Sequence, residues 1–378
     1  MNRFNKTKTT GFTLVEILVV LVIATVVLSL AIPRIRTINK ERTVREAARV
    51  VGSKFANASQ RASIDGIAGV RITRNANFFQ GTFQYAATEV STLRAVPSFT
   101  GDQQDSEITD SDETAGTVDI DEPLEQSALG IIQRGDSISF NHSSIKYLIT
   151  DIDGIGTGTL ELELDRGEGD YLPIPEYDAS ASSNPSYVVH RLPRLLRSSV
   201  ESLPDNHIID LRFSGFEVLD DGDSPTLPRT RQQLTRVFEP VLILSGTINY
   251  TIDFIFDGEG SVDRVIYRDS ATGNSVAARL PLGPIFFFIT EAPNSVAMTD
   301  EVAAASETGL WVTVSNSTGT TNIGYNNSLA AANFTYQTLT DYYNGTYDAD
   351  TIPEMDRDHF NEIISDCRDN SVATSANQ

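Results

Sequence analysis

The sequence predicts an α+β protein in which one long N-terminal helix packs against a large β-rich head. Three observations predict this class. Apolar residues run almost without interruption from Phe12 to Ile32. Apolar side chains then recur at helical spacing as far as Ala62. Beyond Ile67 the pattern changes to short apolar or alternating runs bounded by turn residues, which is typical of strands. A chain of 378 residues also leaves room for insertions in the head.

The apolar run is long enough to cross a lipid bilayer. Its 21 residues include only two Thr, one Ser and a single acid, Glu16. As a helix it would measure about 32 Å, close to the ~30 Å core of a bilayer. A short polar leader, residues 1–11, precedes it and carries Arg3, Lys6 and Lys8.

Three interpretations of this run compete. It is a secretory signal cut after Ala31, a plain membrane anchor, or a signal cut between Gly11 and Phe12 that leaves the helix in the mature protein. Glu16 favours the third, because a carboxylate in an apolar span costs about 2.5–3.5 kcal/mol. After a cut at Gly11, Phe12 becomes the N-terminal residue. Its ammonium group is a cation with which the Glu16 carboxylate can form an ion pair.

The string GFTLVEILVVLVI, residues 11–23, resembles the processing motif of type IV pilins and type II secretion pseudopilins. The glycine before the cut, the phenylalanine after it and the glutamate at the fifth mature position all match. The resemblance implies that a prepilin peptidase cuts after Gly11 and methylates the Phe12 amine. It also implies that Glu16 makes an assembly contact with neighbouring subunits.

The same resemblance implies a location and partners. The protein would rest in the bacterial inner membrane as a single-pass protein, embedded in lipid by residues 12–32, with its head in the periplasm. An assembly platform protein and an ATPase would then move it into a filament with other pilins or pseudopilins. There the 12–32 helices would form the central bundle.

Residues 33–65 are predicted to continue the helix as an amphipathic segment. Pro33 is expected to kink this helix, because proline lacks an N–H donor and crowds the preceding turn. The resemblance to pilins and pseudopilins agrees with this, since members of that family commonly carry a proline at this place. One apolar face recurs at helical spacing and comprises Val44, Ala47, Ala48, Val51, Phe55, Ala58 and Ala62. Residues 34–61 also carry eight Lys or Arg against two Glu. These cations contact lipid headgroups or acidic neighbouring subunits, or they form a solvated helix face.

The head is strongly acidic. Residues 62–378 carry 18 basic and 48 acidic residues, a net charge of −30, so nucleic acid is not an expected partner. Residues 97–130 are predicted to be an acidic, flexible insertion, because large apolar residues are few. The candidate ligands for Ca²⁺ in this insertion are Asp110, Asp112 and Glu113, and also Asp119, Asp121 and Glu122. No EF-hand spacing is present, so we expect a solvated loop and no metal site.

The β-rich head is predicted to extend over residues 66–339. Residues 131–166 form a small β unit of three strands, and further strands are expected at 208–213, 237–244, 251–256, 262–267 and 283–289. The string TIDFIFDGEGSVDRVIYR predicts a hairpin around Asp257–Gly260. This hairpin, together with the passage from the helix into the first strand, resembles the H-type minor pseudopilins and related minor pilins.

Residues 340–378 are predicted to be a polar tail with one short helix. That helix places Cys367, the only cysteine, on an apolar face, so no intrachain disulfide is expected. Many pilin heads close a C-terminal loop with a disulfide, and this chain differs from them because it has a single cysteine.

No catalytic constellation is found in the sequence. The four histidines are scattered, and HExxH, G-x-S-x-G, P-loop and CxxC motifs are lacking. We therefore expect no enzymatic activity and no cofactor. The resemblance implies a minor pilin or pseudopilin subunit in a type II secretion pseudopilus or a type IV pilus. One alternative is a membrane-anchored, β-rich adhesin or binding module outside a filament. Another, a DNA-uptake pilin, would need a basic stripe near the exposed tip, and the only basic stripe lies near the membrane.

Overall fold

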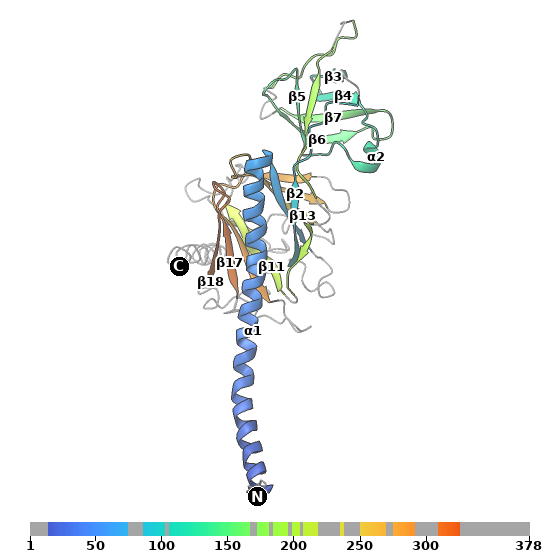
Figure 1. Ribbon diagram of the computed structural model, residues 1–378. Coiled ribbons are helices and arrows are strands. Elements are labelled where there is room, and N and C mark those ends of the chain that lie inside the picture. Colours follow the sequence, from blue (N-terminus) through green and yellow to red (C-terminus); the bar gives the residue numbers. More distant parts are fainter. Residues whose placement is uncertain are drawn as a thin grey trace, which may run out of the picture.

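The computed structural model of the chain describes residues 14–74, 86–102, 106–166, 172–180, 184–195, 199–204, 207–217, 235–237, 250–269, 275–291 and 309–325; within 30–40 it describes the backbone alone. One long helix extends from a β-rich head, and a smaller β lobe lies at the far end of that head (Figure 1). The chain is thus an α+β protein, as predicted.

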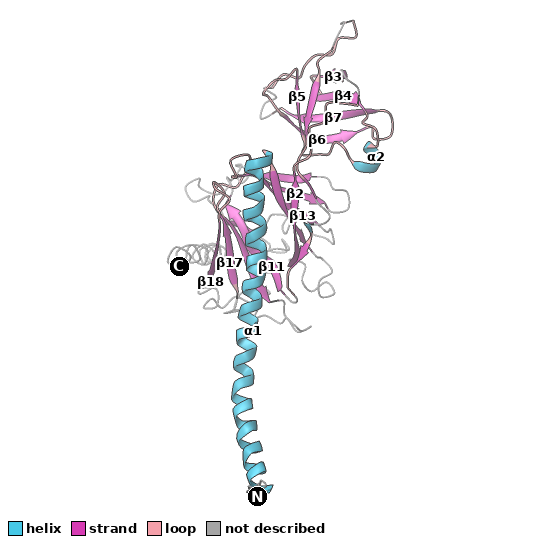
Figure 2. Ribbon diagram, viewed as in Figure 1, coloured by secondary structure: helices cyan, strands magenta, loops and turns pink. Residues whose placement is uncertain are grey.

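Helix α1 (Leu14–Asp65) is continuous over 52 residues, including position 33. Its first part projects from the head, and its second part lies against the main sheet (Figure 2). The helix ends at the turn signal that follows it, where Gly66 adopts a φ of +81°. The bend expected at Pro33 stays a prediction.

The main sheet has twelve strands, and nine of them follow the path β15-β14-β13-β1-β2-β11-β16-β17-β18. Each pair of neighbours on this path is antiparallel. The strands of this path are β1 (Ala68–Arg74), β2 (Ala86–Arg94), β11 (His207–Glu217), β13 (Tyr250–Phe256), β14 (Val262–Asp269), β15 (Ser275–Arg279), β16 (Ile285–Glu291), β17 (Leu310–Val314) and β18 (Thr321–Tyr325). Three short strands lie beside it: β9 (Arg194–Leu195) and β10 (Glu201–Ser202) pair with β2, and β12 (Thr235–Val237) pairs with β11. The predicted strands at 251–256, 262–267 and 283–289 and the Asp257–Gly260 hairpin are confirmed.

The second half of α1 packs on one face of this sheet. All seven residues of the predicted apolar helix face are fully buried, so that face is confirmed. Phe55 lies at its centre, with ring centroids 5.2 Å from Phe254 and 4.8 Å from Phe287. Burial of such a ring stabilises the fold by about 1.5–3 kcal/mol, so this aromatic cluster is a principal attachment of the helix to the head.

Two hairpin turns also meet the helix near its end. The Ser59 hydroxyl donates a hydrogen bond to the carbonyl of Gly260, at 2.9 Å, in the β13–β14 turn. Gly319, in the β17–β18 turn, has a φ of +63°, and a Cβ there would lie 2.3 Å from the Ser59 hydroxyl oxygen. The backbone of both turns therefore approaches the helix more closely than a side chain would allow.

A second lobe, residues 99–190, is inserted between β2 and β9. Its six-stranded antiparallel sheet has the order β3-β4-β7-β6-β5-β8. Its elements are β3 (Ile108–Asp112), β4 (Thr117–Asp121), the short helix α2 (Gln126–Leu129), β5 (Ser137–Phe140), β6 (Tyr147–Asp153), β7 (Thr159–Asp165) and β8 (Tyr187–His190). Its core is separate from that of the main sheet and consists of Ile108, Val118, Ile120, Ile132, Ile138, Phe140, Tyr147, Ile149, Ile152, Leu160, Leu162, Leu164, Ile174, Tyr187 and Val189.

This lobe corrects the prediction of a flexible insertion at 97–130. Apart from 103–105, which lie outside the described residues, the segment contains β3, β4 and α2. Only every second residue of β4 is apolar, yet Val118 and Ile120 are fully buried. The low content of apolar residues reflects strands with one solvated face rather than a lack of structure. The three-strand unit predicted at 131–166 is present as β5, β6 and β7, within a larger sheet.

Several predictions fall outside the described residues. These are the tail at 340–378 with its short helix, Cys367, and the strand at 237–244 beyond Val237.

Candidate functional site

The projecting part of α1 exposes a continuous apolar surface. The large apolar side chains from Leu14 to Leu28 each leave 48–81% of their surface exposed. Soluble monomers rarely expose contiguous apolar patches of more than a few hundred Å². A helix apolar on all sides is typical of a segment that lipid or other helices surround.

Polar side chains in this segment are few, and two of them are hydroxyls that bond within the helix. The hydroxyls of Thr25 and Ser29 each donate to the carbonyl three residues earlier, both at 2.8 Å. Between Leu14 and Ser29 the one charged residue is Glu16, which lies in the first turn and is exposed. Its carboxylate is therefore the feature of this surface that can form a charge-assisted contact with a partner.

The other predicted site residues near the N-terminus are not placed by the structure. Gly11 and Phe12 lie outside the described residues. Pro33 lies in the part of α1 for which only the backbone is described. The contact between Glu16 and a Phe12 ammonium group therefore stays a prediction.

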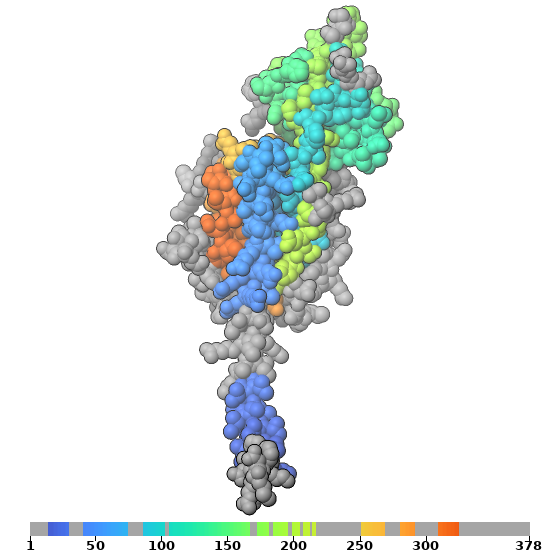
Figure 3. Space-filling view, in the orientation of Figure 1, coloured from blue at the N-terminus to red at the C-terminus, as the bar shows by residue number. Residues whose placement is uncertain are grey.

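The outer side of the second half of α1 carries a basic face, formed by Arg42, Arg45 and Arg49. All three side chains are exposed, and their spacing of three and four residues places them on one side of the helix. Glu41 forms only a weak pair with Arg45, at 3.9 Å. Figure 3 shows this part of the helix at the molecular surface beside β17 and β18. The basic face is thus accessible to a partner.

The small lobe carries the opposite charge. Residues 99–190 contain 20 Asp or Glu and three Lys or Arg, a net charge of −17 within the chain's total of −22. The register of its sheet concentrates this charge. Asp110 lies opposite Asp119, Asp119 opposite Glu161, and Glu161 opposite Asp153. These four residues form an acidic row across β3, β4, β7 and β6 on the solvent face.

The acidic row opposes the stability of the sheet that carries it. Like charges directly opposite one another on neighbouring strands are destabilising. Partial burial, with the charges of Glu161 and Asp110, raises the pKa of Asp119. Among the described residues, no Lys or Arg forms an ion pair with Asp119, Glu161 or Asp153. The row is held in place by the lobe's apolar core on the other side of the sheet.

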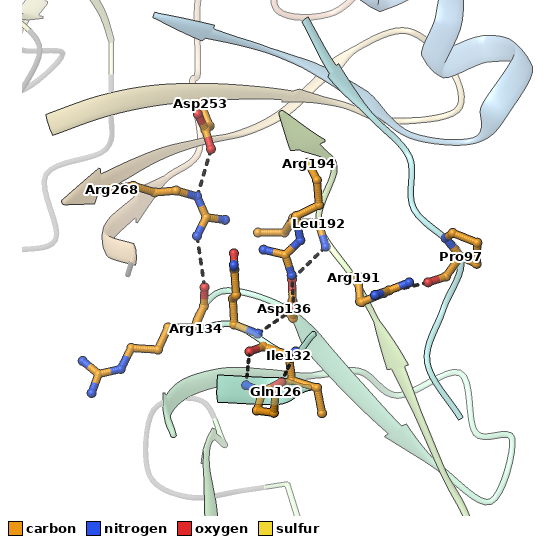
Figure 4. Close-up of polar contacts among 11 residues, drawn as sticks. Pro97, Gln126, Ile132, Arg134, Asp136, Arg191, Leu192, Arg194, Asp253 and Arg268 are labelled. Carbon is orange, nitrogen blue, oxygen red and sulfur yellow. Dashed lines mark hydrogen bonds and ion pairs between the residues drawn. The ribbon is translucent and has the colours of Figure 1, made fainter. Parts of the chain in front are cut away.

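A buried polar junction fixes this lobe on the head (Figure 4). Asp136 is fully buried and accepts hydrogen bonds from Arg194 Nη2 at 2.7 Å and from the backbone N–H groups of Leu192 and Gln133 at 2.8 and 2.9 Å. Burial raises the pKa of Asp136, and Arg194 and the two N–H groups oppose that shift. Since Arg194 begins β9 of the main sheet and Asp136 directly precedes β5, this pair joins the lobe to the main sheet.

A second set of contacts extends the junction into the head. Asp253, on β13, accepts two hydrogen bonds from Arg71, at 2.6 and 2.7 Å, and one from Arg268, at 2.9 Å. Arg268 is 3% exposed and also donates to the carbonyl of Arg134 in the lobe, at 3.4 Å. The two chain segments that enter and leave the lobe are tied by a bond from Arg191 to the carbonyl of Pro97. The orientation of the lobe is thus specified by directional contacts, most of them buried or partly buried.

The acids proposed as Ca²⁺ ligands do not converge. Among the described residues, no group of three or more His, Cys, Asp or Glu is arranged to hold a metal ion. Asp112 and Glu122 instead accept hydrogen bonds from nearby backbone N–H groups.

Sequence reasoning missed the acidic row and the junction. The signal for the row was present in the strings TVDID and TLELELD, where acids alternate with apolar residues at the period of a strand. The register that aligns Asp119 with Glu161 is a property of the pairing. The contact between Asp136 and Arg194 joins residues 58 positions apart, so no local pattern reveals it.

Comparisons with known proteins bear mainly on the N-terminus. Within the described side chains, no helix combines the length and the apolar character needed to cross a membrane. No curated protein matches the chain in sequence. One solved structure, the phage phi92 endosialidase, is 9% identical with a TM-score of 0.19. That alignment covers 71% of this chain and 39% of the endosialidase chain, and this similarity is too low to carry an argument.

The family model of the prokaryotic N-terminal methylation motif matches residues 6–32. The matched segment includes Gly11, Phe12 and Glu16 and most of the exposed apolar surface of α1. The chain therefore carries a prokaryotic N-terminal methylation motif, which supports a type IV pilin-like or pseudopilin-like protein.

Proposed function

We propose that the protein is a minor pilin or pseudopilin, a structural subunit that prepilin peptidase processes after Gly11 and that assembles into a type II secretion pseudopilus or a type IV pilus. The observation that carries this proposal is the exposed apolar part of α1, which holds a single carboxylate and is continuous with the helix that anchors the head. The methylation motif at 6–32 supports it independently.

In this proposal the apolar part of α1 lies first in the membrane and later in the filament. Before assembly, residues 12–32 lie in the inner membrane, and the head lies in the periplasm. In the filament, the same side chains pack against the helices of neighbouring subunits. Both environments remove from water the surface that Leu14–Leu28 exposes in the isolated chain.

Glu16 sets the axial position of the subunit. Its carboxylate pairs with the Phe12 ammonium of a neighbour in a region of low dielectric constant, where an unpaired charge is costly. The pair therefore favours one register of the helices over the others.

The partners implied are prepilin peptidase, an assembly platform protein with its ATPase, and other pilins. No enzymatic activity is assigned to the head.

The Glu16→Ala variant tests the role of the carboxylate. We expect it to be inserted and cut as the wild type is, but to be recovered from sheared filaments at about one tenth of the wild-type level or less, because the Phe12 ammonium loses its partner. Glu41→Ala is the matched control, since Glu41 is also an exposed helix glutamate but lies outside the apolar run. Equal recovery of the Glu16→Ala and Glu41→Ala variants would reject this role.

Mass spectrometry of the mature N-terminus tests the processing step. The proposal requires a chain that begins with methylated Phe12. A chain that begins after Ala31 would contradict the entire proposal. A correctly processed protein found only in the membrane and never in filaments would favour a membrane-anchored binding module instead.

A further inference from the structure

We propose that the acidic row of the small lobe docks on the basic face of α1 in a second copy of this chain. The inference rests on the proposed function, because it takes the copies to be parallel and displaced along the helix axis. It assigns a partner to a surface of the head on which strand register aligns four acids.

The two surfaces are complementary in charge and in form. The acidic row presents Asp110, Asp119, Glu161 and Asp153 in a line across four strands, roughly 15 Å long at the ~4.8 Å spacing of a sheet. The basic face presents three arginines over the seven residues from Arg42 to Arg49, about 11 Å of helix. Arginine is suited to such a contact, because its planar guanidinium matches a carboxylate in two parallel hydrogen bonds.

The two surfaces cannot meet within one chain. Twenty residues of helix, about 30 Å, separate Arg45 from the end of α1 at Asp65. The small lobe lies beyond that end, on the side of the head away from the projecting helix (Figures 1 and 3). A parallel copy shifted toward the lobe by on the order of 30 Å or more brings its basic face level with the acidic row of the first copy.

The junction makes this docking specific. Asp136, Arg194, Arg268 and Asp253 hold the lobe at one orientation through charge-assisted hydrogen bonds that are buried or partly buried. The acidic row is therefore presented at a defined place relative to the helix axis. Docking would also relieve the repulsion between aligned carboxylates that the isolated lobe carries.

Cysteine cross-linking between two copies of the full-length chain tests the inference. One tagged copy carries Glu161→Cys, the other, with a different tag, carries Arg45→Cys, and Cys367→Ser is present in both. We expect a cross-linked species that contains both tags in membranes or filaments. Its yield should fall at least several-fold in about 1 M salt, where the Debye length is about 3 Å. A copy with Glu259→Cys replaces the lobe partner as the control, since Glu259 is an exposed acid on a turn of the main head.

Charge reversal separates docking from chance proximity. Asp119→Lys with Asp153→Lys in the first copy should abolish the cross-link, and Arg42→Glu with Arg49→Glu in the second copy should restore it. Absence of the mixed cross-link, or a cross-link that these reversals leave unchanged, would overturn the inference. Filaments that contain the mature protein but give no cross-link refute the docking alone, whereas a protein that never enters filaments refutes the proposed function.

Discussion

At the scale of single residues, Asp119 is an acid on the solvent face of the lobe whose surroundings disfavour its charge. It lies between Asp110 and Glu161 on neighbouring strands, and its pKa is raised. A raised pKa in the folded state means that folding favours the protonated form. The penalty is therefore present at neutral pH and disappears as the pH falls through the raised pKa toward the ordinary value of 3.8.

Removing this charge should stabilise the lobe. We expect Asp119→Asn to raise the free energy of unfolding at pH 7 by about 0.2–1 kcal/mol, the range for a cross-strand pair. The gain should shrink as the pH falls, because the raised pKa means that more of wild-type Asp119 is then protonated. Denaturant unfolding at pH 7 and at a lower pH, followed by far-UV circular dichroism, measures the difference.

Asp121→Asn is the matched control for this prediction. Asp121 lies on the same strand and the same face, but its neighbour on β7 is Thr159. The control should change the stability less at pH 7. Equal effects of the two variants would contradict the view that alignment of like charges causes the penalty.

At the scale of elements, the close approach of the β17–β18 turn to α1 depends on Gly319. We expect Gly319→Ala to destabilise the head by more than the roughly 1–2 kcal/mol that the left-handed conformation alone costs an alanine. The additional cost arises because its Cβ would lie 2.3 Å from the Ser59 hydroxyl oxygen and 2.5 Å from the Gly260 carbonyl oxygen.

Gly66→Ala separates the two contributions. Gly66 also has a positive φ, +81°, but no heavy atom lies within 4 Å of the position of its Cβ. Trp311 is the only tryptophan and is fully buried in the main sheet, so its fluorescence reports the unfolding of the head. A Gly319→Ala variant no less stable than Gly66→Ala would show that the contact with Ser59 adjusts without cost.

The elements that the sequence predicts well are those with a strong local period. The helix face from Val44 to Ala62 repeats at 3.6 residues, and every member of it is buried. The β13–β14 hairpin is bounded by apolar runs and an Asp-Gly turn. The small lobe is harder to predict, because acidic and hydroxyl side chains outnumber apolar ones in β3 and β4, although the buried positions of both strands are apolar.

At the scale of the whole molecule, three parts of the chain lie one after another along the direction of α1. The exposed apolar helix lies at one end, the main sheet holds the second half of that helix, and the acidic lobe lies at the other end (Figure 1). Pairing of residues far apart in sequence defines this arrangement, since Arg71 contacts Asp253 and Asp136 contacts Arg194. Such pairs leave no periodic signal, which is why the junction could not be predicted from the sequence.

The contacts of the junction predict the order in which the lobe and the head unfold. Asp136→Asn removes the fully buried carboxylate that the partly buried Arg194 contacts. Breaking a fully buried pair costs about 3–5 kcal/mol, and the partial exposure of Arg194 lowers that cost. We expect the lobe of this variant to unfold at lower denaturant concentration than the head. The far-UV circular dichroism signal would then fall before the fluorescence of Trp311 changes.

Asp151→Asn is the control, because its pair with Arg134 is about one-third exposed and should contribute only about 0–1 kcal/mol. Coincident transitions in the Asp136→Asn variant, with a midpoint no lower than that of the control, would show that Asp136 does not hold the lobe on the head.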